Sequence, residues 1–387
     1  EIGLGIPAEP LFRSSYKVPS MSKAITFIRY PPLVLLYTLE RSVVEVTIVK
    51  CKNKGMTKEL FKDGYLIDFQ ATVLSCEKEK DCYKVVLDQS AFYPEAGGQP
   101  SDKGALEQYS VIDVQRKDND IVHFVDQPFE VGQKVQGHID WNHRYDLMQQ
   151  HTAEHIVSGL IHQMYGFDNV GFHMGKTITV DISGFLTWEQ LMEIETKANE
   201  VIQQGIDVNV IYPEENQEGN YRSKKEIDQD LRIVEIDGVD RCACCGIHVA
   251  NTQEIGLMKI LSSMKHKGGT RFEMIASNRA MQDYQYKFNQ NKQISISLKA
   301  SPDQTYEAVE KLKENMEEKE KELSVVYQKY YQSRCTQDSI QIIFESDLSA
   351  FRIKQFCDVL MKEKHVDTCA IVSNGQYVIQ SKNVDYS

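Results

Sequence analysis

The sequence lacks any apolar run that is long enough to cross a membrane. The most apolar stretch near its beginning, residues 33–39, follows two prolines and ends at Glu40 and Arg41. It is far shorter than the roughly 20 residues that a membrane-spanning helix needs. No small-residue cleavage site follows it, which argues against a secretory signal peptide as well. We therefore expect a protein with no membrane partner.

A disulfide framework and an excess of positive charge are also missing. The nine cysteines are odd in number and scattered through 387 residues, which is typical of a protein kept in a reducing, cytoplasmic compartment. The net charge is −12, so the overall composition does not favour nucleic-acid binding. The hydrophobic content of 41% is enough to build two or three cores of a soluble globular protein.

One segment departs from the acidic average. Residues 256–280 carry a single acid, Glu273, and five basic side chains: Lys259, Lys265, Lys267, Arg271 and Arg279. Such a run is usually an ordinary solvated surface, so by itself it only weakly favours contacts to phosphate.

Two short motifs predict a metal site. In the run H-T-A-E-H, His151 and His155 are four residues apart, so on a helix their rings lie one turn apart on the same face. In the run C-C-G-I-H, Cys244 and His248 repeat this spacing. Three imidazoles and one thiolate suit zinc in both type and number.

Two other interpretations of these motifs remain open at this point. Cys242 and Cys245 form a C-x-x-C pair that could bind metal without His248. The first motif also fits H-x-x-E-H, the signature of a family of zinc peptidases, with Glu154 as the base. Such peptidases complete their site with a carboxylate, so the cysteine-rich second motif argues against this alternative.

We predict an α+β protein that begins with a small β-barrel-like domain over residues 56–145. Short β-rich runs separated by turn residues favour a barrel there; they span residues 65–74, 83–87, 104–114, 121–124 and 134–139. Between two of these runs, Gly97 and Gly98 would let the backbone approach a ligand closely. Residues 1–55 carry no interpretable motif and are expected to be an extension outside the functional fold.

An α+β domain that contains the zinc motifs is predicted over residues 146–282. Its expected helices span residues 146–165 and 188–204, the second with a capping box formed by Thr187 and Gln190. The expected strands span residues 171–174, 177–182, 207–212, 231–236, 255–261 and 270–276.

Residues 283–335 are predicted to be a helical linker or coiled-coil segment. Ser301, Pro302 and Gln304 fit the N-cap, first and third positions of a helix. Apolar residues then follow one heptad frame and indicate the seam of a helical hairpin or a short coiled coil; they are Val309, Leu312, Met316, Leu323, Val326 and Tyr330. Residues 336–387 follow the pattern strand–helix–strand–strand of an incomplete α/β domain, with elements at 340–344, 350–362, 368–372 and 377–381.

Three motifs together resemble the AlaX family of free-standing alanyl-tRNA editing proteins, which are similar to the editing domain of alanyl-tRNA synthetase. The motifs are F-Y-P-x-x-G-G-Q-P-x-D-x-G from residue 92, Q-H-T-A-E-H from residue 150 and C-x-G-x-H-V from residue 244. The resemblance covers roughly residues 60–282. The heptad helix and the unfinished C-terminal domain resemble the longer family members.

The resemblance implies one zinc ion per chain, held by His151, His155, Cys244 and His248, with His248 as the ligand most easily released. Aligning the motif on His248 selects Cys244 rather than its neighbours. The sequence departs from the common C-G-G-T-H pattern at Cys245 and Ile247, which leaves a second thiol beside the ligand.

The implied activity is ATP-independent hydrolysis of Ser-tRNA(Ala), Gly-tRNA(Ala) or both. A pocket for alanine rejects a missing methyl by only about 1–3 kcal/mol, so a second, hydrolytic site is the physical remedy. Zinc would activate water or hold the substrate. Glu154 stands where members often have Gln, and we favour a role in capping and solvating the helix over a role on the substrate.

The resemblance also assigns residues to the substrate. Gly97, Gly98 and Gln99 would line the route of the tRNA(Ala) acceptor end, and Thr152 would donate its hydroxyl to a seryl group. The acceptor phosphates would meet three basic side chains, Lys265, Lys267 and Arg271. If the protein forms a homodimer, we expect it to do so through the C-terminal helix or domain. The main alternative is a non-catalytic RNA-binding protein that is stabilised by zinc.

Overall fold

The computed structural model describes side chains for residues 57–382, except residues 119, 214–218 and 224–230. Before residue 57 it describes the backbone of a four-stranded antiparallel sheet, β1 (Ser14–Tyr16), β2 (Ile25–Tyr30), β3 (Leu33–Glu40) and β4 (Val43–Lys50). We predicted that residues 1–55 are an extension outside the functional fold. Their side chains lie outside the described residues, so this stays a prediction. The chain divides into two compact units, Glu1–Gln282 and Asp283–Ser387, which are described separately.

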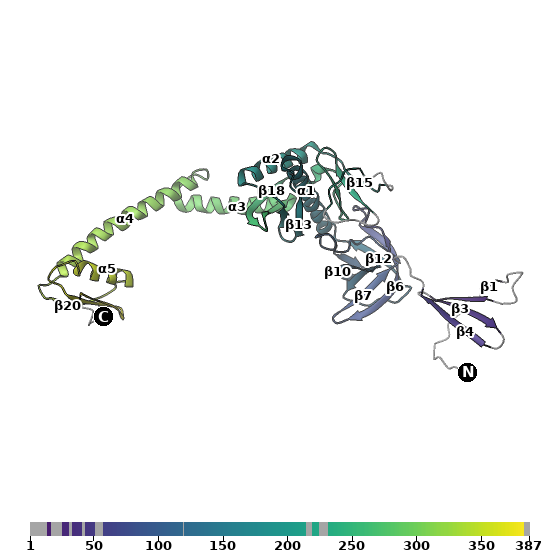
Figure 1. The fold of residues 1–387 in the computed structure, drawn as a ribbon, viewed down its shortest axis with the longest axis horizontal. Helices are drawn as coiled ribbons and strands as arrows, with labels where there is room; N and C mark the ends of the chain where they lie inside the picture. The colour runs from purple at the N-terminus through teal and green to yellow at the C-terminus, as the bar shows by residue number, and fades with distance from the viewer. Residues whose placement is uncertain are drawn as a thin grey trace. The chain divides into compact units, whose positions relative to one another are not determined.

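A closed β-barrel follows, and it confirms the predicted barrel. Neighbouring strands are hydrogen-bonded in the order β10-β11-β7-β6-β12-β9. They are β6 (Asp68–Glu79), β7 (Cys82–Leu87), β9 (Gly104–Leu106), β10 (Tyr109–Lys117), β11 (Asp120–Val125) and β12 (Lys134–Ile139). Figure 1 labels β6, β7, β10 and β12 of this barrel. Two short strands, β5 (Lys58–Glu59) and β8 (Gln89–Ser90), pair in parallel beside it. Alternating apolar residues of these strands fill the interior, as the period of two requires.

Two of the predicted barrel strands had wrong boundaries. The single strand expected over residues 104–114 is a hairpin of β9 and β10, because Glu107 adopts a left-handed backbone with φ 54°. The strand expected over residues 65–74 begins at Asp68 and continues to Glu79. It pairs there with β7 across a tight turn that contains Lys80, another residue with positive φ.

Helix α1 (Trp141–Tyr165) is the central element of the first unit. It begins at Trp141 rather than at the predicted Asp146, because the Asp140 side chain accepts a hydrogen bond from the His143 amide and caps the helix. Gly166 ends it in the left-handed conformation. Most residues between Arg144 and Ile161 are buried, so both faces of the helix contact other elements.

Two small sheets surround this helix. One has the order β13-β14-β19-β18, formed by β13 (Asn169–Met174), β14 (Ile178–Ile182), β19 (Gly269–Ala276) and β18 (Met258–His266). The other is β15-β16-β17, formed by Val208–Ile211, Ile233–Ile236 and Asp240–Ala243. Helix α2 (Trp188–Gln204) packs against α1, and its predicted capping box of Thr187 and Gln190 is confirmed. A short 3-10 helix, Thr252–Ile255, precedes β18.

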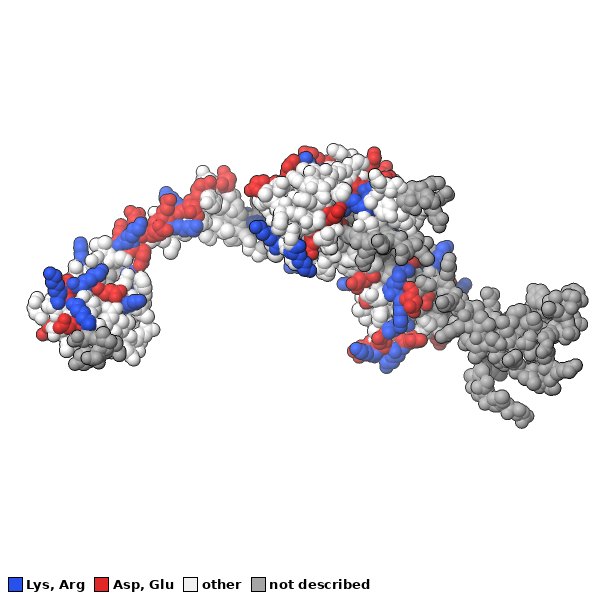
Figure 2. All heavy atoms as spheres, viewed as in Figure 1, with Lys and Arg blue, Asp and Glu red and all other residues white. Residues whose placement is uncertain are grey.

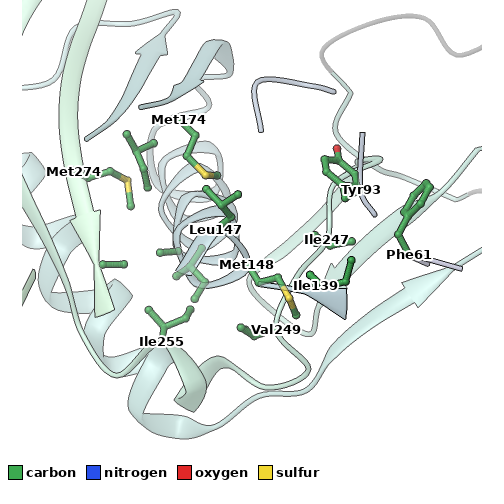
Figure 3. Close-up of a cluster of buried hydrophobic side chains, with 14 of the residues drawn as sticks. Phe61, Tyr93, Ile139, Leu147, Met148, Met174, Ile247, Val249, Ile255 and Met274 are labelled. Atoms are coloured by element: carbon green, nitrogen blue, oxygen red, sulfur yellow. The ribbon is translucent and has the colours of Figure 1, made fainter. Parts of the chain in front are cut away.

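One hydrophobic core joins the barrel to these sheets. Leu147 and Met148 project from α1 between residues of both parts (Figure 3). Ile139 comes from the barrel, while Ile247 and Val249 come from the loop that follows β17. The loop that carries the second metal motif is therefore anchored by its own apolar residues against α1.

The second unit confirms the predicted strand–helix–strand–strand pattern. Strand β20 (Ile340–Glu345) pairs in parallel with β21 (Thr368–Ser373), which pairs antiparallel with β22 (Gln376–Ser381). Helix α5 (Ala350–Leu360) packs against β21 and β22 and buries Phe356 and Leu360.

The helices that precede this sheet differ from the prediction at one point. Helix α3 (Ser277–Leu298) ends before a turn, and helix α4 (Thr305–Arg334) begins at Thr305. The expected N-cap at Ser301 is wrong, because Ser301 donates to the Gln304 side chain within the turn. Most of the heptad residues of α4 are exposed; Met316 is 65% and Val326 62% exposed. Among the described residues, no helix has the length and apolar character needed to span a membrane.

Candidate metal centre

The two motifs meet in space beside α1. His151 and His155 lie one turn apart on α1, and the loop after β17 brings Cys244 and His248 to the same place. The possible ligand atoms of these four residues all lie within 4.8 Å of one another. The Sγ of Cys244 is 3.6 Å from the Nε2 of His151 and 3.5 Å from the Nε2 of His248. The three histidines are buried, and Cys244 is partly buried.

Each of the three histidines is held through its other ring nitrogen. The Nδ1 of His151 lies 2.7 Å from the Oε1 of Gln99, and the Nδ1 of His155 lies 2.8 Å from a carboxylate oxygen of Asp240. The Nδ1 of His248 lies 3.2 Å from the hydroxyl of Thr152. Because Nδ1 is occupied in every case, Nε2 is left as the metal-binding nitrogen.

The donor set and its spacing fit zinc. With bonds of about 2.3 Å to sulfur and about 2.0–2.1 Å to nitrogen, tetrahedral ligands lie about 3.5 Å apart. The sulfur-to-nitrogen distances of 3.5 and 3.6 Å match that edge. The Gly246 amide donates to the sulfur of Cys244 at 3.3 Å, which further stabilises a thiolate.

The electrostatics of the cluster's own side chains favour an ionised Cys244 and a neutral His248. Burial opposes ionisation of Cys244, but the neighbouring His151 and His155 outweigh it and hold the pKa of the thiol well below its usual value. Burial and the charge of His151 hold the pKa of His248 well below its usual value, so this ring is neutral. A thiolate and a neutral imidazole are the forms that coordinate zinc. Although burial opposes the charge of His155, Cys244 and Asp240 raise the pKa of His155 well above its usual value, so metal binding there would displace a proton.

The other two cysteines of the motif lie differently. Cys245 is exposed, whereas Cys242 is buried on β17 and directs its thiol toward the Ala243 carbonyl. Cys242 does belong to a second group of possible ligands, with His155 and Asp240. That group shares His155 with the four-residue cluster, and its Asp240 is engaged with the ring nitrogen that faces away from the cluster.

Gln99 and the two preceding glycines form the loop beside His151. Gly98 has φ +88°, and a Cβ there would meet the ring and carbonyl of Phe172, so the loop can lie against β13 only with glycine at this position. Phe172 in turn stacks on the His151 ring, with centroids 5.2 Å apart. Gly97 has φ +61° and open space around it. Gln99 is completely buried, and no described acceptor lies within hydrogen-bond distance of its Nε2.

The side chains of Thr152 and Glu154 are buried and hydrogen-bonded to other parts of the protein. The Thr152 hydroxyl contacts the Met148 carbonyl as well as the His248 ring. Glu154 is 2% exposed and accepts hydrogen bonds from Ser158 and Asn169. The expectation that Glu154 caps and solvates the helix is wrong, because its carboxylate lies in the interior between α1 and β13.

Two family models match parts of this chain. Residues 43–143 match the family model of class II (A) tRNA synthetases. Residues 231–273 match the model of the second additional domain of threonyl and alanyl tRNA synthetases, and this match includes Cys244 and His248. The first match begins inside the segment 1–55 and extends to the start of α1.

Curated relatives are about one third identical to this chain over the residues that align. Alanyl-tRNA editing protein Aarsd1-A of Xenopus laevis is 34% identical over 276 residues, which cover 66% of this chain and 67% of the relative. Alanyl-tRNA editing protein AlaX-L of Pyrococcus horikoshii is 33% identical over 57% of this chain and 58% of its own length. The alanine–tRNA ligase of Ignicoccus hospitalis is 33% identical over 67% of this chain but only 30% of the ligase.

The chain belongs to the family of alanyl-tRNA editing proteins. Its two candidate metal motifs lie on α1 and in the loop after β17, and the loop with Gly97, Gly98 and Gln99 lies beside them. Three further residues that sequence reasoning selected lie elsewhere, on the hairpin of β18 and β19.

The three basic residues of this hairpin make different contacts. Arg271 forms a two-pronged ion pair with Asp181. Lys265 lies 6.0 Å above the Phe185 ring, and Lys267 occupies the turn with φ 43°. Figure 2 shows Lys and Arg side chains mixed with Asp and Glu over the visible face. Arg271 is therefore held on the protein surface by its own carboxylate partner.

Sequence reasoning missed several residues that shape the site of this editing protein. Asp240 lies 85 positions from His155, and its neighbour Arg222 lies in a segment without any motif. Arg232 donates to the carbonyls of Cys244 and Gly246 and so holds the ligand loop. A cavity of about 760 Å³ lies on the outer side of Asp240 and Arg222, with His162 and Gln163 in its wall. No spacing rule connects these positions, because only the tertiary fold brings them together.

Proposed function

We propose that this chain is a zinc-dependent trans-editing hydrolase that deacylates mischarged tRNA(Ala), with Ser-tRNA(Ala), Gly-tRNA(Ala) or both as substrates. The observation that carries the proposal is the buried cluster of three histidines and one cysteine. Each histidine has Nδ1 occupied and Nε2 turned inward, in a chain of the alanyl-tRNA editing family. The reaction is hydrolysis of an ester and needs no ATP.

His151, His155, Cys244 and His248 would hold one Zn²⁺ per chain. Bound there, the metal would act as a Lewis acid that lowers the pKa of water or binds a polar group of the substrate. A catalytic site needs an open position, and four protein ligands would fill a tetrahedron. His248 is the best candidate for a ligand that gives way, because its Nδ1 contact to Thr152 is longer, at 3.2 Å, than the contacts of the other two rings.

Gln99 contributes to the reaction in two ways. Its Oε1 fixes the orientation of His151, and its Nε2 is a buried donor that has no acceptor among the described residues. An unpaired buried donor is costly, so a substrate oxygen that accepts from Nε2 gains binding energy. We assign this donor to the aminoacyl carbonyl or the terminal ribose. Gly97 and Gly98 would line the path of the acceptor end: Gly97 has open space beside it, and Gly98 holds the loop against Phe172.

The remaining residues have supporting roles. Thr152 would act on the substrate through His248, since its hydroxyl is committed to that ring and to the Met148 carbonyl. Glu154 would hold α1 against β13 rather than touch the substrate. Lys265 and Lys267 would contact phosphates of the tRNA, and Arg271 would order their hairpin through Asp181. The exposed heptad residues of α4 would support a homodimer, and the protein would act in the cytoplasm.

Deacylation assays test the proposal. The purified protein is incubated with Ser-tRNA(Ala), Gly-tRNA(Ala) and, as the control, correctly charged Ala-tRNA(Ala). We expect rapid loss of serine, glycine or both, and sparing of alanine. We also expect hydrolysis to stop after metal chelation and to return with Zn²⁺. A folded, zinc-loaded protein that hydrolyses none of the three would refute the enzyme assignment and favour a zinc-stabilised RNA-binding protein.

A further inference from the structure

The carboxylate of Asp240 connects a metal ligand to an arginine. One of its oxygens, Oδ2, lies 2.8 Å from the Nδ1 of His155. The other, Oδ1, accepts from the Nε of Arg222 at 2.8 Å and from its Nη2 at 2.7 Å. The Asp240 side chain is 1% exposed and the Arg222 side chain 13% exposed, so water screens this pair very little.

The backbone of Arg222 is fixed to the same strand. Its amide donates to the Arg241 carbonyl, and its carbonyl accepts from the Ala243 amide, both at 2.8 Å. These bonds pair Arg222 in parallel with Cys242 along β17. Ala243 immediately precedes Cys244, so Arg222 holds the end of the strand from which the cysteine ligand extends.

The geometry points to Arg222 as a positioning residue for the metal centre, which orients His155 through Asp240 and Cys244 through the backbone of β17. The inference rests on the proposed metal site. Arg222 touches no ligand atom itself. Its two donors converge on Oδ1 and hold the Asp240 carboxylate in place, so that Oδ2 meets the Nδ1 of His155 and the Nε2 of that ring points into the cluster.

The reason for an arginine at this position is electrostatic and geometric. A carboxylate that is buried beside a histidine strengthens that histidine as a ligand, but an uncompensated buried charge is costly. The guanidinium neutralises Asp240 and holds Oδ1 with two converging donors from one planar group, which a lysine could not do. Although burial opposes its charge, the Asp240 carboxylate raises the pKa of Arg222, so this compensation persists at every physiological pH.

The experiment measures metal binding without tRNA. Zinc affinity is determined by competition with a chromophoric chelator, and the Co²⁺-loaded protein is examined by its d–d absorption bands. The variants are Arg222→Met, Arg222→Lys, Asp240→Asn and the double variant of Arg222→Met with Asp240→Asn. Arg352→Met is the matched control, because Arg352 is also a mostly buried arginine paired with a carboxylate, Glu320, in the unit without the cluster.

We expect Arg222→Met to weaken zinc binding about 10–100-fold, the range found when a partner of a metal ligand is removed. The Co²⁺ bands should shift, because the geometry at the metal changes. Arg222→Lys should restore part of the affinity, and the double variant should bind about as weakly as Asp240→Asn alone. Arg352→Met should bind zinc as the wild type does.

Wild-type affinity and unchanged Co²⁺ bands in Arg222→Met would overturn the inference, as would full additivity in the double variant. Failure of the wild type to bind zinc would overturn it together with the metal site. A wild type that binds zinc but hydrolyses no aminoacyl-tRNA would refute the proposed activity alone, so the two failures can be told apart.

Discussion

The side-chain oxygen of Gln99 lies 2.7 Å from the Nδ1 of His151, although 52 residues separate them in the chain. This contact connects the glycine-containing loop of the barrel to the first ligand on α1. Similar contacts hold His155 and His248, each from a different element. The candidate metal centre is therefore assembled from the barrel, α1 and β17 together, and each element can be tested separately.

Gln99→Ala should weaken zinc binding and deacylation while leaving the fold intact. The change removes the acceptor of the His151 ring and the buried donor assigned to the substrate. We expect a loss of about 10-fold or more in metal affinity, measured by chelator competition. Gln115→Ala, on β10 of the same barrel, is the control and should bind metal normally. Unchanged affinity and unchanged hydrolysis in Gln99→Ala would contradict the role given to this loop.

Gly246→Ala should disrupt the metal centre by steric overlap. A Cβ at Gly246 would collide with Cε1 and Nδ1 of His151 and would lie 2.8 Å from the Oε1 of Gln99. The His151 ring must move, and we expect loss of zinc from the purified variant, measured as metal content. Gly175→Ala is the matched control, because its Cβ would meet its nearest atom at 3.4 Å, an ordinary contact. Full zinc occupancy in Gly246→Ala would show that the loop lies elsewhere.

His123 should make the protein less stable as the pH falls. It is completely buried in the barrel, between the Ser90 hydroxyl and the Val85 carbonyl, and burial lowers its pKa to about 4. The unfolded chain takes up a proton near pH 6.5, but the folded protein resists it until about pH 4. Stability from this residue is thus fully present above about pH 6.5, and about 3 kcal/mol of it is lost on acidification to pH 4.

Urea unfolding of the wild type and of His123→Gln, measured between pH 7 and pH 4, isolates this effect. The variant should be less stable at pH 7, and the difference between the two proteins should shrink as the pH decreases. A constant difference over this range would mean that His123 titrates normally in the folded state.

Arg144→Met should destabilise the first unit strongly. Arg144 and Asp102 form a completely buried ion pair, and Arg144 also donates to the Leu66 and Ala91 carbonyls. Removing the arginine leaves a buried carboxylate without compensation, which costs about 3–5 kcal/mol. Denaturant unfolding measures the loss. Arg271→Met, which breaks a partly exposed pair, should cost at most about 1 kcal/mol; equal losses in both variants would contradict the distinction.

Local signals in the sequence were sufficient for much of the fold. The capping box of Thr187 and Gln190 marks the start of α2, and the alternating apolar residues mark the barrel strands. The start of α1 was missed for two reasons. Residues 141–145 show no apolar period, and His143 stands three residues after Asp140, where a capping box would have Glu or Gln. The prediction of Ser301 as an N-cap was wrong, because Ser301 and Gln304 lie in a turn and α4 begins only at Thr305.

The site was predictable only where its residues cluster in the chain. The spacing of His151 with His155 and of Cys244 with His248 identified the four possible ligands, which the fold brings within 4.8 Å of one another. The residues that hold these ligands could not be predicted. Asp240 contacts His155, and Arg222 contacts Asp240, only because the fold places β17 and the segment around Arg222 beside α1. The burial of Glu154 could not be predicted either, because glutamate is usually a surface residue but lies here in the interior.

The most direct measurement compares two adjacent cysteines. Cys244→Ala and Cys245→Ala are assayed for zinc content and for hydrolysis of Ser-tRNA(Ala), because Cys244 lies in the cluster and Cys245 is exposed. We predict that Cys244→Ala loses both zinc and hydrolysis, while Cys245→Ala keeps both. Hydrolysis at the wild-type rate by a zinc-free Cys244→Ala protein would contradict the account that this cluster is the centre of the editing reaction.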